Sequence, residues 1–169
     1  EIVRQNRAAI AWLWQNAGDI GIDRDRIHVC GHSAGGHLVT MLLATQWPEF
    51  CPGVPANLIK SGCAISGLYE LEPVRLTYLN DTLRMDAAMA ARNSPLQRDY
   101  PAGAPLLIVV GGAESEEFLR QSKAMTDQWK RLGYDADLVA PQGLNHFSIV
   151  DEFARPDNAL VNKQLEHIV

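Results

Sequence analysis

The stretch Gly31-His32-Ser33-Ala34-Gly35-Gly36 decides the fold, because it joins a strand pattern directly to a helix pattern. Residues 26–30 before it form a short β-prone run, and residues 34–45 after it form a strongly apolar helical run. A G-x-S-x-G turn in this setting is tight and strained, and it holds the serine hydroxyl above the end of the sheet. The turn leaves no room for a side chain two residues before or after the serine, which explains Gly31 and Gly35.

Strand and helix patterns alternate through the rest of the chain. Further strands are expected at three apolar runs, residues 58–65, 106–110 and 137–140. Helices are expected from Val3 to Ala17, from Phe118 to Leu132, and after the capping residue Asn158. Strands that alternate with helices form a mostly parallel sheet with flanking helices, so the expected fold class is α/β.

Two of these helices have clear features in the sequence. The first is expected to end at Gly18 and Gly21. In the second, apolar residues recur on one face before Gly133, which can end the helix: Phe118, Met125, Trp129 and Leu132.

The chain is expected to form one compact unit. Its 169 residues, 47% of them hydrophobic, are enough for a single core of ordinary domain size. Residues 66–104 mix polar residues, prolines and short helical pieces, and we interpret them as an excursion from the sheet rather than a second domain. The chain begins at Glu1 without a methionine and already inside a helical pattern, so it is expected to be part of a longer protein.

Charge and composition exclude several kinds of partner. The 15 Lys and Arg residues against 20 Asp and Glu residues give a net charge of −5, without the basic stripe that a nucleic-acid backbone requires. No apolar run approaches the roughly 20 residues that cross a bilayer. A soluble, cytoplasmic protein that binds neither nucleic acid nor membranes is therefore expected.

The three cysteines, Cys30, Cys51 and Cys63, fit neither a metal-binding C-x-x-C spacing nor a disulfide framework. Cys30 and Cys63 lie in apolar runs, so we expect free, buried thiols in a reducing compartment. No cluster of ligating residues indicates a metal site, and no organic cofactor is expected.

Ser33 needs a base, because a serine hydroxyl alone is a weak nucleophile. A histidine takes its proton and a carboxylate orients the histidine, in the chain order serine, acid, histidine for the α/β-hydrolase type. His146 fits this order, since it lies in the loop 142–148 after the last expected strand. The other histidines are more simply strand, turn or helix residues, with the last one solvated: His28, His32, His37 and His167.

The serine and the histidine could also have purely structural roles. Ser33 could merely cap the following helix, and His146 could be an ordinary loop histidine. Three carboxylates compete for the role of the acid just after residues 106–110: Glu114, Glu116 and Glu117. Glu114 is nearest to the strand, whereas Glu116 and Glu117 are expected in the first helical turn, where acidic residues also stabilise the helix dipole.

Several motifs together resemble the kynurenine formamidase (arylformamidase) group of α/β-hydrolases. The resemblance spans residues 1 to about 155 and corresponds to the C-terminal two-thirds of the family pattern. The residues that carry it are Gly31-His32-Ser33-Ala34-Gly35-Gly36, Ser66-Gly67-Leu68-Tyr69-Glu70-Leu71-Glu72-Pro73, Asn80-Asp81-Thr82-Leu83-Arg84-Met85, Arg92-Asn93-Ser94-Pro95, Glu114-Ser115-Glu116-Glu117-Phe118 and His146-Phe147-Ser148.

The resemblance implies a catalytic triad of Ser33, Glu114 and His146, with residues 66–104 covering the active site. Many members of the group have an aspartate at the position of Glu114. The family also has further N-terminal strands and an H-G-G-x-W loop that supplies part of the oxyanion hole, and neither is found in this sequence. The other oxyanion donor, the N–H of Ala34, is retained. The chain alone is therefore expected to be a poor catalyst or inactive, and the intact protein is expected to include an upstream half.

The activity implied by the resemblance is hydrolysis of N-formyl-L-kynurenine to kynurenine and formate through a formyl-serine intermediate, a step of tryptophan catabolism. A carboxylesterase or thioesterase would use the same triad, and a non-catalytic binding module could share the fold. The expected partner is a small-molecule substrate. Spacing alone assigns neither the substrate-binding residues nor the oligomeric state, for which a homodimer is one option.

Overall fold

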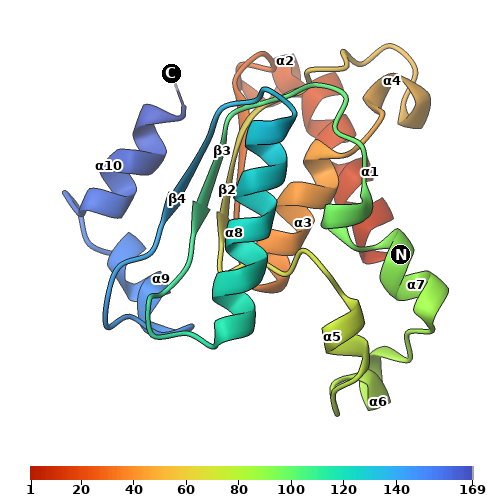
Figure 1. The fold of residues 1–169 in the computed structure, drawn as a ribbon. Coiled ribbons are helices and arrows are strands. Elements are labelled where there is room, and N and C mark those ends of the chain that lie inside the picture. Colours follow the sequence, from red (N-terminus) through yellow and green to blue (C-terminus); the bar gives the residue numbers. More distant parts are fainter. Residues whose placement is uncertain (169) are drawn as a thin grey trace.

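The computed structural model describes residues 1–168, and its centre is a parallel sheet with strand order β1-β2-β3-β4 (Figure 1). The strands are β1 (Ile27–His32), β2 (Ile59–Ile65), β3 (Leu106–Val109) and β4 (Ala136–Val139). All four predicted strands are present, and their ends lie within two residues of the predicted ones. The α/β fold class is thereby confirmed.

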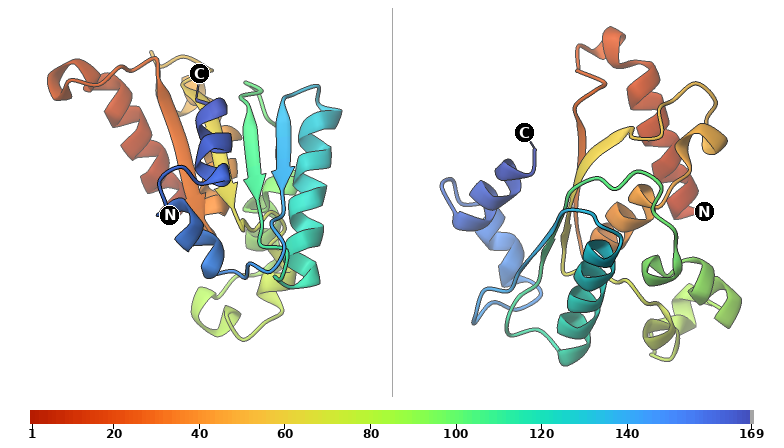
Figure 2. Two further views of the ribbon diagram at one scale, coloured as in Figure 1. Left: turned by 90° about the vertical axis from the view of Figure 1, so that its left-hand side faces the viewer. Right: turned by 45° about the horizontal axis from the view of Figure 1, so that its top comes forward.

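Helices cover both faces of the sheet (Figure 2). One face carries α1 (Ile2–Gln15), α3 (Ala34–Leu43) and α8 (Glu116–Arg131), and the other carries α9 (Ser148–Phe153) and α10 (Ala159–Glu166). Two short helices, α2 (Ala17–Ile20) and α4 (Trp47–Phe50), complete the first layer. The sequence did not indicate α4 or α9, because helices of four and six residues show hardly any periodicity.

The most deeply buried strand is β3, whose sequence LLIV is apolar on both faces. On one side of the sheet, Leu106 and Ile108 belong to the large core cluster that includes Trp129. On the other side, Leu107 and Val109 pack with Ile149 and Leu160. A strand that is covered on both faces has no position for a polar side chain, which accounts for the unbroken apolar run.

Helix α8 buries two of the residues predicted for its apolar face but leaves a third exposed. Met125 and Trp129 are fully buried, and the Trp129 indole N–H donates to the Ala104 carbonyl at 3.0 Å. Leu132, in contrast, is the exposed C-cap residue and does not lie on the buried face. The helix ends at Arg131 and Leu132 caps it. Gly133, which follows, has a left-handed φ of +81° and changes the direction of the chain there.

Helix ends elsewhere also depart from the simplest pattern. The first expected helix is two helices. Helix α1 ends at Gln15, and α2, which contains Gly18, ends at Ile20 and is capped by Gly21 with a left-handed φ of 72°. The predicted cap of the last helix is confirmed, since the Asn158 side chain accepts from the Leu160 N–H at 2.8 Å. His167 is not solvated as expected, because only 7% of its side chain is exposed beside Asp137.

The segment between β2 and β3 lies at the carboxyl ends of the strands (Figure 1). It contains α5 (Glu72–Arg75), α6 (Asn80–Leu83), α7 (Ala87–Arg92) and the 3-10 turn η1 (Pro95–Gln97). Gln121 of α8 joins the beginning of this segment to the main layers, because its amide oxygen accepts from the Tyr69 and Glu70 N–H groups at 2.7 and 2.8 Å. These hydrogen bonds hold the beginning of the segment beside the carboxyl ends of the strands.

The thiols differ from the prediction in one respect. No disulfide forms among the three cysteines, and Cys63 is buried, but Cys30 is exposed. Helices α9 and α10 pack against residues of β2 and β3, and the apolar cluster that they form contains no residue of β1. Cys30 of β1 nevertheless lines one cavity together with Gln164 of α10.

None of the helices in residues 1–168 combines the length and the apolar character needed to cross a bilayer.

Candidate active site

Ser33 occupies a strained turn between β1 and α3. Its backbone has φ 57° and ψ −116°, a region that a residue with a side chain rarely adopts. The Ser33 N–H donates to the Ile65 carbonyl at 2.8 Å, so the end of β2 holds the turn. This arrangement places the hydroxyl at the carboxyl edge of the sheet.

The glycines around the serine confirm the steric interpretation for one position and correct it for another. A Cβ on Gly31 would lie 2.4 Å from the Gly35 carbonyl oxygen, so no larger residue fits there. Gly35 itself would place a Cβ in open space among the described residues, which contradicts the prediction. The second steric requirement falls on Gly36, whose Cβ would lie 2.8 Å from the Gly67 Cα.

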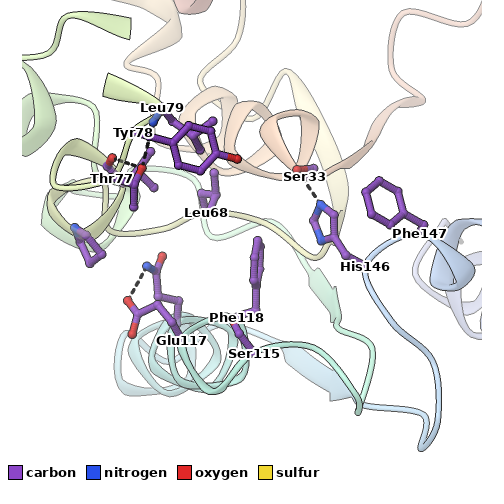
Figure 3. Close-up of a pocket in the computed structure, with 13 residues that line it drawn as sticks. Ser33, Leu68, Thr77, Tyr78, Leu79, Ser115, Glu117, Phe118, His146 and Phe147 are labelled. Carbon is purple, nitrogen blue, oxygen red and sulfur yellow. Dashed lines mark hydrogen bonds between the residues drawn. The ribbon is translucent and has the colours of Figure 1, made fainter. Parts of the chain in front are cut away.

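His146 connects the serine to a carboxylate, and Figure 3 shows the hydrogen bond between its ring and Ser33. Its Nε2 lies 3.0 Å from Ser33 Oγ, and its Nδ1 lies 2.8 Å from Glu114 Oε2. A carboxylate can only accept, so Nδ1 carries the proton and Nε2 accepts from the serine hydroxyl. The three predicted residues therefore form one continuous hydrogen-bonded chain.

The Glu114 carboxylate is almost completely buried, with 1% of its side chain exposed. Its Oε1 accepts from the Ser66 hydroxyl at 2.5 Å and from the Gly111 N–H at 2.7 Å, which leaves Oε2 for the histidine. The two competing carboxylates lie elsewhere, since Glu116 and Glu117 are in the first turn of α8 and Glu117 pairs with Arg120. The geometry thus selects Glu114 among the three candidates.

Ser66 was not singled out from the sequence. It follows β2 as Ser33 follows β1, it is fully buried, and its φ of 48° is also left-handed. Its N–H donates to the Val109 carbonyl at 2.7 Å, so the neighbouring strand fixes its position. A polar residue directly after a buried parallel strand is the signal that could have indicated it, because such ends share one edge of the sheet.

His32 is the second residue whose role near the site was missed. Its Nε2 donates to the His146 carbonyl at 2.8 Å, and the two rings lie 4.5 Å apart. Phe118 packs on the same histidine with ring centroids 4.8 Å apart. Burial lowers the pKa of His32, which favours the neutral ring. These neighbours restrict the positions that the His146 ring can adopt.

The N–H of Ala34 begins helix α3 directly after Ser33. Within residues 1–168 no backbone acceptor is found for it, as is usual for the first N–H groups of a helix. The positive end of the helix dipole lies at the same place. A developing oxyanion next to Ser33 could therefore accept from this group.

Two cavities border the turn that contains Ser33 and Ala34. The first, of about 540 Å³, is bordered by Ser33 and His146 and has apolar and aromatic walls that include Leu68, Tyr78 and Phe118 (Figure 3). The second, of about 330 Å³, is bordered by Ala34 and is also largely apolar, with Met89 among its lining residues. The surroundings of Ser33 and Ala34 can thus hold apolar groups.

Several known proteins are similar to this chain in sequence. Residues 2–50 match the family described as BD-FAE. The chain is 31% identical to the kynurenine formamidase of Danio rerio over 144 residues and 32% identical to that of Salmo salar over 149 residues. These alignments cover 82% and 83% of the chain but 48% and 49% of the relatives. The chain therefore spans about half the length of the curated relatives it matches.

A solved structure agrees in fold and in sequence. The crystal structure of a proposed thioesterase from Silicibacter sp. TM1040 has a TM-score of 0.76 and 32% sequence identity to this chain. The match covers 96% of this chain and 56% of that one. The chain has the α/β-hydrolase fold, and kynurenine formamidases are among its homologues.

Proposed function

We propose that this chain carries the catalytic triad of a serine hydrolase that cleaves the formamide bond of N-formyl-L-kynurenine. The observation that carries the proposal is the continuous hydrogen-bonded chain from Ser33 through His146 to Glu114. The substrate is inferred from the homologous kynurenine formamidases, and the products are kynurenine and formate.

Acylation begins when Ser33 Oγ attacks the formyl carbon while His146 Nε2 takes its proton. Glu114 holds Nδ1–H and stabilises the imidazolium that results. The carbonyl oxygen becomes an oxyanion, to which the Ala34 N–H donates. Ser66 acts through Glu114: its hydroxyl and the Gly111 N–H fix Oε1, so that Oε2 is directed at the histidine.

Departure of the arylamine requires a proton, because an aniline nitrogen is a poor leaving group as an anion. The His146 imidazolium donates that proton as the C–N bond breaks. Water then attacks the formyl-serine, His146 again takes the proton, and formate leaves as Ser33 is regenerated. In each step the proton passes through His146, which lies within hydrogen-bond distance of both Ser33 and Glu114.

The larger cavity suits the arylamine half of this substrate. Its aromatic walls include Tyr78 and Phe118, against which a planar anilino ketone can pack. Residues 66–104 supply Leu68 and Tyr78 to this cavity, so we propose that the segment covers the active site. This placement would bring the formyl carbon beside Ser33 and its oxygen toward Ala34.

A second candidate is hydrolysis of a carboxylic ester or thioester. A formyl group has no carbon chain, and yet a further apolar cavity of about 330 Å³ opens beside Ala34, where an acyl chain could lie. The similarity to a proposed thioesterase points in the same direction. The triad and its mechanism would be unchanged.

Turnover on two substrate classes tests the proposal. The formamidase assignment predicts a higher kcat/KM for N-formyl-L-kynurenine than for p-nitrophenyl acetate and butyrate. Activity confined to the esters, with an increase from acetate to butyrate, would replace the formamidase assignment by the esterase one. Ser33→Ala is the control in both assays and should lower turnover by about 10³-fold or more.

A further inference from the structure

The larger cavity beside Ser33 also contains one charged side chain that the proposed mechanism does not use. The walls of this cavity come from the turn at Ser33, the segment 68–79, the start of α8 and the loop at His146, so all of them lie within residues 33–147. Most of the lining side chains are apolar. Among the described residues that line the cavity, Glu117 is the one Asp, Glu, Lys or Arg.

Glu117 lies at the end of the cavity that is remote from the triad. Figure 3 shows Ser33 and His146 at one end and Glu117 at the other. Phe118, the next residue of α8, packs on the His146 ring with centroids 4.8 Å apart and so lies between the two ends. The cavity therefore presents a nucleophile, then an aromatic wall, then a carboxylate.

The parts of N-formyl-L-kynurenine follow the same order. Its formamide nitrogen is bonded to an aromatic ring, the ring carries a ketone, and the ketone side chain ends in an ammonium group and a carboxylate. When the formyl carbon lies at Ser33 and the ring packs against Phe118, the end of the side chain is directed toward Glu117.

The Glu117 carboxylate is ionised and has room for a further donor. Arg120 donates to both of its oxygens at 2.7 Å, and the Gln121 amide donates to Oε1 at 2.8 Å. The hydrogen bond from Arg120 lowers the pKa of Glu117. A carboxylate has about four acceptor positions, so these contacts leave one on Oε2, and 42% of the side chain is exposed.

The positive charge of Arg120 does not fully neutralise Glu117. The same guanidinium also pairs with Glu70 at 2.5 Å, so two carboxylates share one cation. Arg120 itself is not among the residues that line the cavity. The end of the cavity therefore carries a net negative charge, which attracts a cation and repels an anion.

Given the proposed function, we propose that Glu117 determines specificity by accepting from an ammonium group at the end of the substrate remote from the scissile bond. The class of substrate is then an aryl formamide whose ketone side chain ends in an amine. A carboxylate at that position would be repelled. In N-formyl-L-kynurenine, the ammonium group therefore faces Glu117 and the carboxylate faces away from it.

Glu117 also takes part in the ion pairs that hold Glu70 beside α8. A role limited to these ion pairs would change the binding of every ligand of the cavity alike, whereas an ammonium-binding role changes the binding of cationic ligands alone. The ratio of the Kd values of a neutral and a cationic ligand of the same shape separates the two roles.

Kynurenamine and ortho-aminobutyrophenone are such a pair of ligands. Both are anilino ketones, and the side chain ends in an ammonium group in the first and in a methyl group in the second. In isothermal titration calorimetry, Glu117→Gln should raise the Kd of kynurenamine by about threefold to fivefold, as expected for the loss of a partly exposed ion pair. The Kd of ortho-aminobutyrophenone should stay constant.

Two further variants sharpen the test. Glu116→Gln is the matched control, because Glu116 lies in the same first turn of α8 but does not line the cavity. It should leave both Kd values unchanged. Arg120→Gln removes the cation that shares Glu117, so it should increase the preference for kynurenamine over ortho-aminobutyrophenone, opposite to the effect of Glu117→Gln.

Equal changes of both Kd values in Glu117→Gln would overturn the proposal, and so would a folded chain that does not bind kynurenamine. These measurements require no turnover, so an inactive chain leaves the test intact. A negative result would leave the triad and the proposed hydrolase function untouched, because neither depends on the remote end of the cavity. Far-ultraviolet circular dichroism of each variant checks that it has folded.

Discussion

The buried carboxylate of Glu114 accepts hydrogen bonds from the Ser66 hydroxyl, the Gly111 N–H and His146. A glutamate has one more rotatable bond than an aspartate, so its carboxylate needs more restraint to present one oxygen to a histidine. The two donors on Oε1 supply that restraint. In the proposed mechanism, Ser66 is accordingly a positioning residue that acts through Glu114.

The Ser66→Ala variant tests this role at the level of a single hydroxyl. A hydrogen bond to a charged group contributes about 1.5–3 kcal/mol, so kcat for p-nitrophenyl acetate should fall by about tenfold or more, while KM stays nearly constant. In a Glu114→Ala background the same substitution should change kcat hardly at all, because no carboxylate is left to position.

The matched control is Ser122→Ala. Ser122 is also fully buried, but its hydroxyl has no hydrogen-bond partner among residues 1–168. Its loss should leave kcat unchanged. Equal losses of kcat from Ser66→Ala with and without the Glu114 carboxylate would show that Ser66 acts only on the general structure.

At the residue scale, a residue could be predicted where a local motif or the chain order marks it. Ser33 and His146 were indicated by a local motif and by chain order, and the structure places them within hydrogen-bond distance. Ser66 and Glu114 are 48 residues apart, and their contact depends on the pairing of β2 with β3. A single sequence does not specify that register, so the hydroxyl partner of the acid was not predicted.

At the scale of elements, the close approach of α3 to the turn after β2 depends on Gly36. An added Cβ there would lie 2.8 Å from the Gly67 Cα, so Gly36→Ala must move the helix or the turn. Overpacking of this kind lowers the free energy of unfolding by about 1–3 kcal/mol. Chemical denaturation of the variant should show a loss in that range.

Gly35→Ala is the neighbouring control. Its Cβ would meet no described atom within 4 Å, and alanine is favoured over glycine inside a helix by about 0.5–1 kcal/mol. Its free energy of unfolding should therefore stay constant or rise. Destabilisation of Gly35→Ala that matches or exceeds that of Gly36→Ala would contradict the steric assignment.

His37 joins α3 to the segment that follows β2, since its Nε2 donates to the Asn93 carbonyl at 2.7 Å. Burial lowers the pKa of His37 below its ordinary value of 6.5. As the pH falls below that value, the unfolded chain binds a proton that the folded chain does not bind. Its contribution to stability is therefore fully present above pH 6.5 and is lost at lower pH.

The unfolding midpoint temperature should therefore fall between about pH 7.5 and about pH 5.5. His37→Gln removes one titrating group while retaining an amide donor, so this variant should show a smaller fall. His28 and His32, whose pKa values burial also lowers, should continue to contribute. An equal fall in His37→Gln and in the unaltered chain would exclude the assignment to His37.

Elements with strong apolar patterns were predicted well, whereas short ones were not. The strands β1 to β4 and helix α8 bury enough apolar surface to be evident in the sequence. Helices α5, α6 and α7 have four to six residues each, and their bounds depend on tertiary hydrogen bonds such as the one from His37 to Asn93. Local propensity alone does not determine such elements.

At the scale of the whole molecule, the two faces of the sheet differ in their cover. The layer with α3 and α8 positions the residues of the candidate active site, and the layer with α9 and α10 packs its apolar side chains on β2 and β3, with Gln164 of α10 beside Cys30 of β1. Cys30 is nevertheless exposed. The apolar sequence around Cys30 could not reveal this, because exposure depends on how distant parts of the chain pack.

The central claim is that His146 and Glu114 activate Ser33 as a nucleophile. Reaction with a fluorophosphonate probe, followed by peptide mapping, measures this directly and does not depend on the identity of the substrate. We predict a single adduct on Ser33 that is abolished in Ser33→Ala and formed much more slowly in His146→Ala. A folded chain that forms no adduct, or forms it on another residue, would contradict the account.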